Sequence, residues 1–110
     1  RVHGPQVEIS TNGNAGWVYG EALEGGWLSQ DRSNEKARGA FVKGEWNKYR
    51  IRAKGDLIKT WINGVSVANL VGNEESFKEG FIGLQVHGVS RGTGPFEVRW
   101  RNIYLRSLEN

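Results

Sequence analysis

The Asn63-Gly64 dipeptide constrains the fold of this chain most strongly, because it separates two short segments of alternating apolar residues, 57–62 and 65–70. Asn and Gly both tolerate the positive φ angles that the tightest β-hairpin turns require. A second turn sequence, 54–56, precedes this pair of segments and also contains a glycine. We therefore expect consecutive antiparallel strands joined by tight turns.

Similar segments occur along the rest of the chain, and they are listed here by residue range: 6–10, 17–20, 46–53, 80–88 and 96–105. The 16 glycines are scattered between these segments, as expected for turns and bulges. Residues 29–44 are polar and lack the apolar stripe of a docked helix, so we expect a loop there, with a short helix as the alternative. Seven or eight short strands without a convincing helix predict an all-β sandwich or barrel.

Residues 80–88 alternate most regularly, which predicts a strand with two different faces. One face is aliphatic and is expected to pack against the core, whereas the other carries Gln85 and His87 and could form the polar floor of a ligand site. The expected core residues are Tyr49, Ile51, Ile58, Ile62, Val67, Ile82, Leu84, Val86, Val98 and Ile103, with Trp46 and Trp100 beside them.

The composition argues against several classes of protein. The net charge is only +3, and Lys and Arg alternate with Asp and Glu along the chain, so no basic stripe indicates a nucleic-acid site. No apolar run is long enough to span a membrane. The chain has no cysteine, which excludes disulfides and thiolate chemistry.

Several short motifs together resemble the 3-keto-disaccharide hydrolase domain family, which was long described as a domain of unknown function. The motifs lie in family-like order and spacing at residues 4–9, 16–20, 46–49, 54–55, 61–64, 80–87 and 98–103. The resemblance implies a concanavalin A-like (laminin G-like) jelly-roll sandwich of two antiparallel sheets. It also implies cleavage of glycosides, including 3-keto sugars, by hydrolysis or elimination.

The resemblance further implies how the domain is organised and where it acts. Residues 1–110 are expected to form one partial β-sandwich domain, because the opening segment of the family precedes the motif at 4–9 and is absent here. A sandwich that lacks its opening strands leaves unpaired edges, so we expect a homodimer or a higher oligomer. Family members are common among bacterial secreted and periplasmic proteins, which is the location expected for this chain.

The candidate site residues combine aromatic platforms with polar groups, as sugar sites do. The expected substrate-binding residues are Gln6, Trp17, Tyr19, Trp27, Trp61 and Gln85. Glu8 is the preferred catalytic carboxylate, because it shares a strand face with Gln6. Its natural partner would be Glu21, with His87, the second residue assigned to catalysis, as an alternative proton carrier.

Two further alternatives stay open. No cofactor is expected, since two histidines alone do not make a zinc site, although His87 with Glu8 and water could hold a divalent metal. The chain could also be a non-catalytic carbohydrate-binding module, because the same sandwich fold serves both functions. Abstraction of a proton next to a ketone needs one base and a group that stabilises the enolate, which suits a site with few paired carboxylates.

Overall fold

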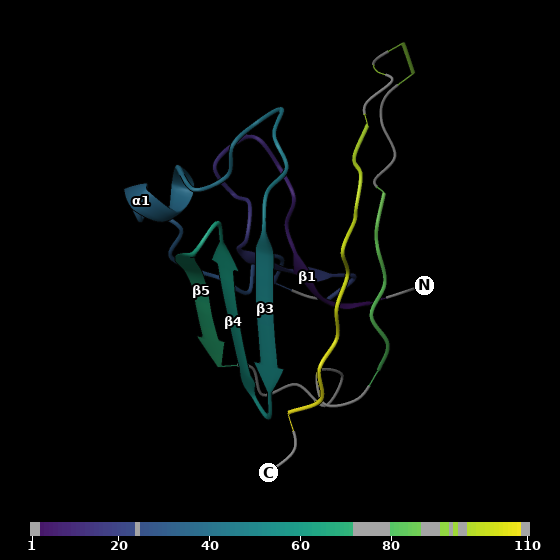
Figure 1. Cartoon of the computed structure of the whole chain (residues 1–110). Helices are drawn as coiled ribbons and strands as arrows, with labels where there is room; N and C mark the ends of the chain where they lie inside the picture. The colour runs from purple at the N-terminus through teal and green to yellow at the C-terminus, as the bar shows by residue number, and fades with distance from the viewer. Residues whose placement is uncertain are drawn as a thin grey trace. The chain divides into compact units, whose positions relative to one another are not determined.

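The computed structural model describes residues 3–23, 25–71, 80–86, 91–92, 94 and 97–108. The chain divides into two compact units, Arg1–Gly80 and Phe81–Asn110. The helix and strands of the described residues all lie in the first unit (Figure 1): β1 Gly4–Val7, β2 Val18–Glu21, α1 Glu35–Arg38, β3 Tyr49–Lys54, β4 Leu57–Ile62 and β5 Val65–Val71. They form two antiparallel sheets, β1-β2 and β3-β4-β5, which confirms the all-β prediction, while the jelly-roll order stays a prediction.

The three-stranded sheet contains both turns expected from the sequence. Asn63 and Gly64 have φ angles of 51° and 82°, as the β4–β5 hairpin turn requires. The Asn63 side chain also accepts a hydrogen bond from Lys48 N–H and donates one to the carbonyl of Ala40. The dipeptide therefore closes the hairpin and fastens the preceding loop to it.

The β1-β2 sheet continues past its regular ladder into a bulge at Glu8. Glu8 N–H donates to the carbonyl of Trp17, whereas the carbonyl of Glu8 accepts from Gly16 N–H, both at 2.9 Å. Two residues of one strand thus oppose one residue of the other, and Gly16 has a φ of +87°, the arrangement of a G1 bulge. The bulge ends the pairing and fixes the position of Glu8.

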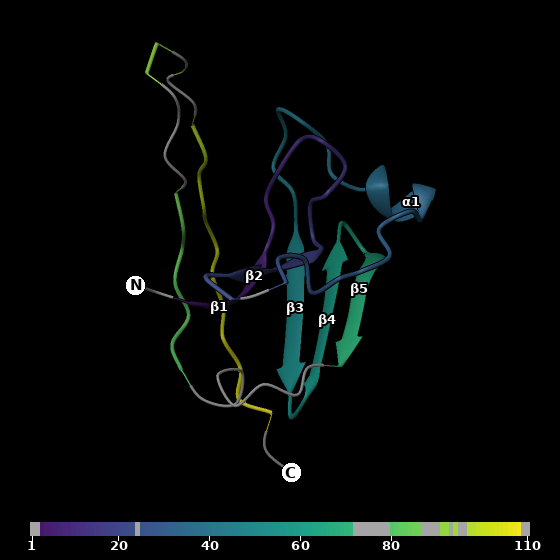
Figure 2. The same cartoon turned by 180° about the vertical axis from the view of Figure 1, so that it is seen from behind.

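One buried threonine joins the two sheets. The hydroxyl of Thr60 donates to the carbonyl of Gly16 over 2.6 Å and accepts from Ala68 N–H over 2.9 Å. Thr60 is fully buried, so both hydrogen bonds are shielded from water. Figures 1 and 2, which view the molecule from opposite sides, agree that the β1–β2 hairpin crosses one face of the three-stranded sheet.

The core of the first unit lies at this crossing. Ile58 and Ile62 are buried as predicted, at 8% and 0% exposure. The prediction is wrong for Ile51, which lies on the outer strand β3 and is 52% exposed, and for Trp46, which is 49% exposed in a loop. Their places near the core are taken by residues of the crossing hairpin and of α1, namely Ala15, Trp17, Val18 and Ala37.

The short helix α1 interrupts the segment for which a loop was predicted. Asn34 caps the helix, because its side-chain oxygen accepts a hydrogen bond from Ala37 N–H over 3.0 Å. Ala37 is the buried residue of this single turn. One small apolar residue makes no periodic pattern, so the alternative of a short helix could not be favoured from the sequence.

The second unit contradicts the strand prediction over residues 81–86, whereas residues 87 and 88 lie outside the described residues. The structure assigns no strand to residues 81–86 or 97–108, although the two segments run side by side in both views (Figures 1 and 2). The expected core residues there are exposed: Ile82, Leu84, Val86, Val98 and Ile103. Two neighbouring extended segments cannot bury an apolar face by themselves, which explains the exposure within this unit.

Candidate functional site

A row of polar and aromatic side chains crosses the outer face of the β1-β2 sheet. Gln6 lies directly opposite Tyr19 in the strand register, and Tyr19 in turn bridges to Trp27. Opposed residues of antiparallel strands point to the same face. The rings of Tyr19 and Trp27 meet edge to face with centroids 5.2 Å apart, so the row presents an amide, a phenol and an indole together.

Arg32 adds a positive charge at the Trp27 end of this row. Its guanidinium carbon lies 4.2 Å from the centroid of the Trp27 ring, which is a close cation–π contact. One nitrogen of the same group donates to the carbonyl of Ser29 over 2.6 Å. Both contacts hold the guanidinium in place, so the row ends in a fixed cation.

Glu8 stands at the other end, and its backbone is held from two sides. Its carbonyl accepts from Gly16 N–H in the bulge and from the hydroxyl of Tyr49 on β3, the latter over 2.8 Å. The first hydrogen bond comes from the β1-β2 sheet and the second from the three-stranded sheet. The position of Glu8 is therefore set by the junction of the two sheets.

Tyr49 stays protonated in this environment. Burial of the phenol raises the pKa of Tyr49 well above its usual value, and the negative charge of Glu8 raises it further. The phenol therefore acts as a donor to the Glu8 carbonyl over the whole neutral range. Tyr49 was predicted as a core residue, and the strand alternation gave no sign of this polar contact.

The amide of Gln6 orients the Glu8 side chain. Its nitrogen donates to Glu8 Oε1, while its own oxygen is buried without a hydrogen-bond partner among the described residues. Buried polar atoms normally have a partner. The Gln6 amide is therefore held with its nitrogen on Glu8 and its oxygen turned away from solvent.

The remaining candidate residues lie elsewhere. Trp17 is only 2% exposed and packs in the core, and Trp61 lies on the three-stranded sheet beneath the guanidinium of Arg50. Gln85 belongs to the second unit and is exposed. His87 lies outside the described residues. The structure thus brings together four of the predicted residues: Gln6, Glu8, Tyr19 and Trp27.

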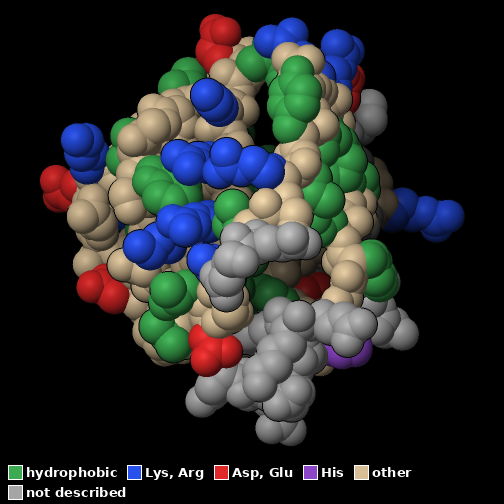
Figure 3. Space-filling view, turned by 60° about the horizontal axis from the view of Figure 1, so that its bottom comes forward, with side chains coloured by type: hydrophobic (Ala, Val, Ile, Leu, Met, Phe, Trp, Pro, Cys, Tyr) green, Lys and Arg blue, Asp and Glu red, His purple; other side chains and the backbone are tan. Residues whose placement is uncertain are grey.

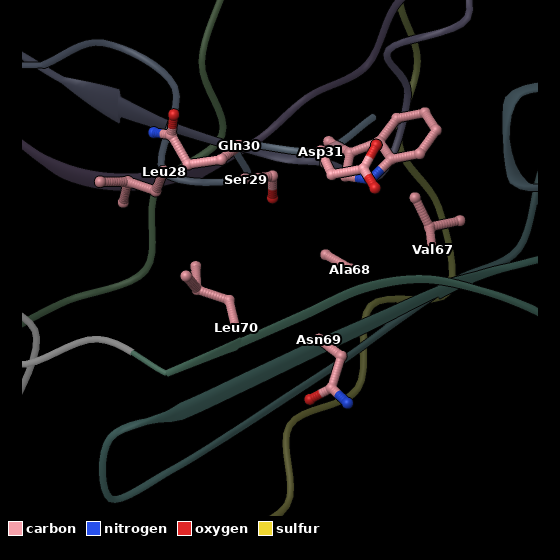
Figure 4. A pocket seen from close by; sticks show the side chains of 9 residues that line it. Leu28, Ser29, Gln30, Asp31, Val67, Ala68, Asn69 and Leu70 are labelled. Atoms are coloured by element: carbon pink, nitrogen blue, oxygen red, sulfur yellow. The ribbon is translucent and has the colours of Figure 1, made fainter. Parts of the chain in front are cut away.

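A pocket of about 360 Å³ lies between residues 28–31 and β5 (Figure 4). Its lining is mainly apolar: Leu70 points from β5 toward residues 28–31 in Figure 4, and Leu28, Val67 and the Trp17 indole also contribute. At its rim, hydrogen bonds from Ser33 hold the pKa of Asp31 below its usual value. The pocket contains neither Glu8 nor Gln6, so it is separate from the row described above.

Two tests for other kinds of site are negative within the described residues. No three His, Cys, Asp or Glu side chains there gather closely enough to hold a metal ion. None of the helices in this part of the chain is both long and apolar enough to cross a membrane.

Comparison with protein families matches residues 1–106 to the 3-keto-alpha-glucoside-1,2-lyase-like domain. The chain belongs to this family. The match covers nearly the whole sequence and includes both units. A search among curated proteins gives no match. Family membership agrees with the resemblance found from the short motifs, and it connects the chain with the chemistry of 3-keto glycosides.

Two residues of the site were not expected from the sequence. Arg32 lies in the polar segment 29–44, which contains several other charged residues, so nothing in the sequence distinguishes Arg32 from them. Tyr49 occupies an inward position of β3, which favoured a purely apolar role. Only the structure shows that the first stacks on Trp27 and that the second bonds to Glu8.

Proposed function

We propose that the chain cleaves 3-keto glycosides by elimination, with Glu8 as the base. The observation that carries the proposal is the carboxylate of Glu8, oriented by Gln6 and fixed at the junction of the two sheets. Elimination needs one positioned base, whereas hydrolysis of a simple glycoside usually needs two carboxylates. Glu8 and Glu21 share the outer face of the β1-β2 sheet, but they lie at opposite ends of it, because Glu21 pairs with Gly4 in the strand register, and only Glu8 is oriented by Gln6.

The proposed step begins at the sugar carbon next to the ketone. The C3 ketone acidifies the hydrogen on C2, and Glu8 accepts this proton. The electron pair of the C2–H bond forms a C1=C2 double bond, while the C1–O bond breaks and leaves its pair on the departing oxygen. That oxygen then takes a proton from solvent, and the products are an unsaturated keto sugar and a free alcohol.

The other residues of the row would bind the sugar. Tyr19 and Trp27 present ring surfaces for its apolar side. The guanidinium of Arg32 lies at the opposite end of the row from Glu8, where in our proposal it contacts a remote hydroxyl of the bound glycoside.

The test uses the full chain and a 3-keto-α-glucoside with a nitrophenol leaving group. Release of nitrophenol should fall by about 10²–10⁴-fold in Glu8→Gln, which keeps the size of the side chain but cannot accept the proton. Glu35→Gln is the matched control, because it makes the same change at an exposed position on α1. Equal rates in the Glu8 variant and the wild type would contradict the role of Glu8. Binding of the glycoside without turnover by the wild type would indicate a carbohydrate-binding module instead.

A further inference from the structure

The outer face of the three-stranded sheet gathers positive charge from two strands. The strands β3, β4 and β5 contain four charged residues, and all four are cations: Arg50, Arg52, Lys54 and Lys59. The register pairs Arg52 with Lys59, so all four side chains share one face. Asp56 in the β3–β4 turn is the one carboxylate between residues 49 and 71.

These cations are accessible to solvent. Three of them are exposed and Lys59 is half-buried. None of the four forms an ion pair with a carboxylate of the described residues. Figure 3 shows Lys and Arg side chains gathered across one side of the molecule, with hydrophobic side chains among them. A face of this kind attracts anions.

The neutral residues of the same face are suited to a sugar chain. Trp61 lies opposite Arg50 in the register, and the guanidinium of Arg50 is 5.0 Å from the centroid of its ring. Ser66 and Asn69 pair with Trp61 and Lys59, so a hydroxyl and an amide stand beside the charges. Trp61 was expected from the sequence to bind sugar, and the structure places it here, on a different sheet from Glu8, with its ring under Arg50, so in our proposal it positions that guanidinium.

We propose that this face, defined by Arg50, Arg52, Lys54, Lys59 and Trp61, binds an acidic polysaccharide whose charges are uronate carboxylates. The planar carboxylate matches the fork of an arginine guanidinium, and two arginines follow each other on one face of β3. Ser66 and Asn69 would bond to ring hydroxyls. The face is separate from the row that ends in Glu8, so it binds whether or not Glu8 acts as a base.

A nucleic acid fits the face less well than a uronate chain. Proteins that bind single strands stack bases on free aromatic rings, whereas the indole of Trp61 is half-buried and already covered by Arg50. Binding of duplex DNA depends on many phosphate contacts, and this face offers four cations. We therefore treat DNA binding as an outcome that would overturn the proposal.

Titration of the full chain with polygalacturonate, followed by calorimetry, tests the proposal. The double variant Arg50→Gln/Arg52→Gln should weaken binding by about fivefold or more, because it removes two charge-assisted contacts. Lys36→Gln/Lys43→Gln is the matched control, since it removes the same charge from exposed positions outside the sheet and should change binding less than about twofold. Fully methyl-esterified polygalacturonate, which keeps the backbone without the charge, should not bind.

Three results would overturn the proposal. The first is an equal loss of affinity for polygalacturonate in both double variants. The second is binding of the esterified polymer as tight as that of polygalacturonate, and the third is tighter binding of duplex DNA or dextran sulfate than of polygalacturonate. If Arg50→Gln/Arg52→Gln melts at a lower temperature than the wild type, Arg52→Gln/Lys54→Gln replaces it, because it leaves the contact between Arg50 and Trp61 in place. Turnover of the keto glycoside by these variants should match the wild type, which separates this test from that of Glu8.

Discussion

Strand β4 and residues 81–86 carry similar alternating apolar side chains, yet only β4 buries them. Ile58 and Ile62 are 8% and 0% exposed, whereas Ile82 and Val86 are 75% and 74% exposed. The difference lies in the partner layer, because the β1–β2 hairpin crosses the face of β4, and the second unit has no second layer of its own among the described residues. Alternation therefore predicts a segment with two faces, but it does not tell which face finds a partner.

The largest expected effect tests this comparison directly. Ile62→Ala should lower the free energy of unfolding by about 2–5 kcal/mol, as truncation of a fully buried aliphatic side chain does. Leu84→Ala, at a side chain that is 54% exposed, should change it by less than about 0.5 kcal/mol. Urea denaturation of both variants measures the two values.

A loss of several kcal/mol in Leu84→Ala would break the comparison, because it would show that Leu84 is buried in solution. Light scattering would then decide the cause. A mass above that of the monomer would indicate that the self-association expected from the sequence covers the second unit, and a monomeric mass would place the burial within one chain.

A smaller effect concerns the junction of the two sheets. A Cβ atom at Gly16 would lie 2.7 Å from Ile62 Cδ1, and the residue has a φ of +87°, so Gly16→Ala should cost about 2–4 kcal/mol. Gly55→Ala is the control, because its φ is +57° and nothing lies within 4 Å of the added atom. It should cost about 1 kcal/mol, the penalty of the backbone conformation alone.

Thermal or urea unfolding measures the stability of the two glycine variants. Equal losses of unfolding free energy would mean that the close approach of Gly16 to Ile62 does not hold the two sheets together, and that only the positive φ matters at both positions.

The smallest effect is expected at the hydroxyl that bonds to Glu8. Tyr49→Phe removes one partly buried hydrogen bond and should cost about 0.5–1.5 kcal/mol at neutral pH. The pKa of Tyr49 is raised in the folded state, so above pH 10 the unfolded chain loses this proton while the folded chain retains it. The wild type should therefore lose its advantage over Tyr49→Phe as the pH rises above about 10. A difference that stays constant up to pH 11 would contradict the raised pKa.

The turns were the most predictable part of the structure. Asn63 and Gly64 have the dihedral angles that their residue types favour, and this local chemistry needs no tertiary information. The buried position of Trp17 was not predictable in the same way, because a tryptophan beside a turn serves equally well as a sugar platform or as core. The outcome depends on the bulge at Gly16 and on Thr60 across the sheets, which are contacts between distant segments.

The candidate site was also predictable only where it depends on local sequence. The alternation of β1 correctly placed Gln6 and Glu8 close together, as their hydrogen bond shows. The register with Tyr19 and the bridge to Trp27 depend on how three segments align, and the contacts of Arg32 and Tyr49 depend on the tertiary packing. Side chains that meet through packing leave no regular spacing in a sequence.

The central claim, that Glu8 removes the proton from C2, is tested most directly by running the reaction in D₂O. Elimination breaks the C2–H bond, so the unsaturated product should carry no hydrogen on C2, and recovered substrate should exchange its C2 hydrogen for deuterium whenever proton removal reverses, as NMR shows. Glu8→Gln should lose this exchange, and Glu35→Gln should retain it. Release of the alcohol from a sugar that keeps its original hydrogen on C2 would contradict the proposal, because the bond to the leaving group would then be broken by direct hydrolysis.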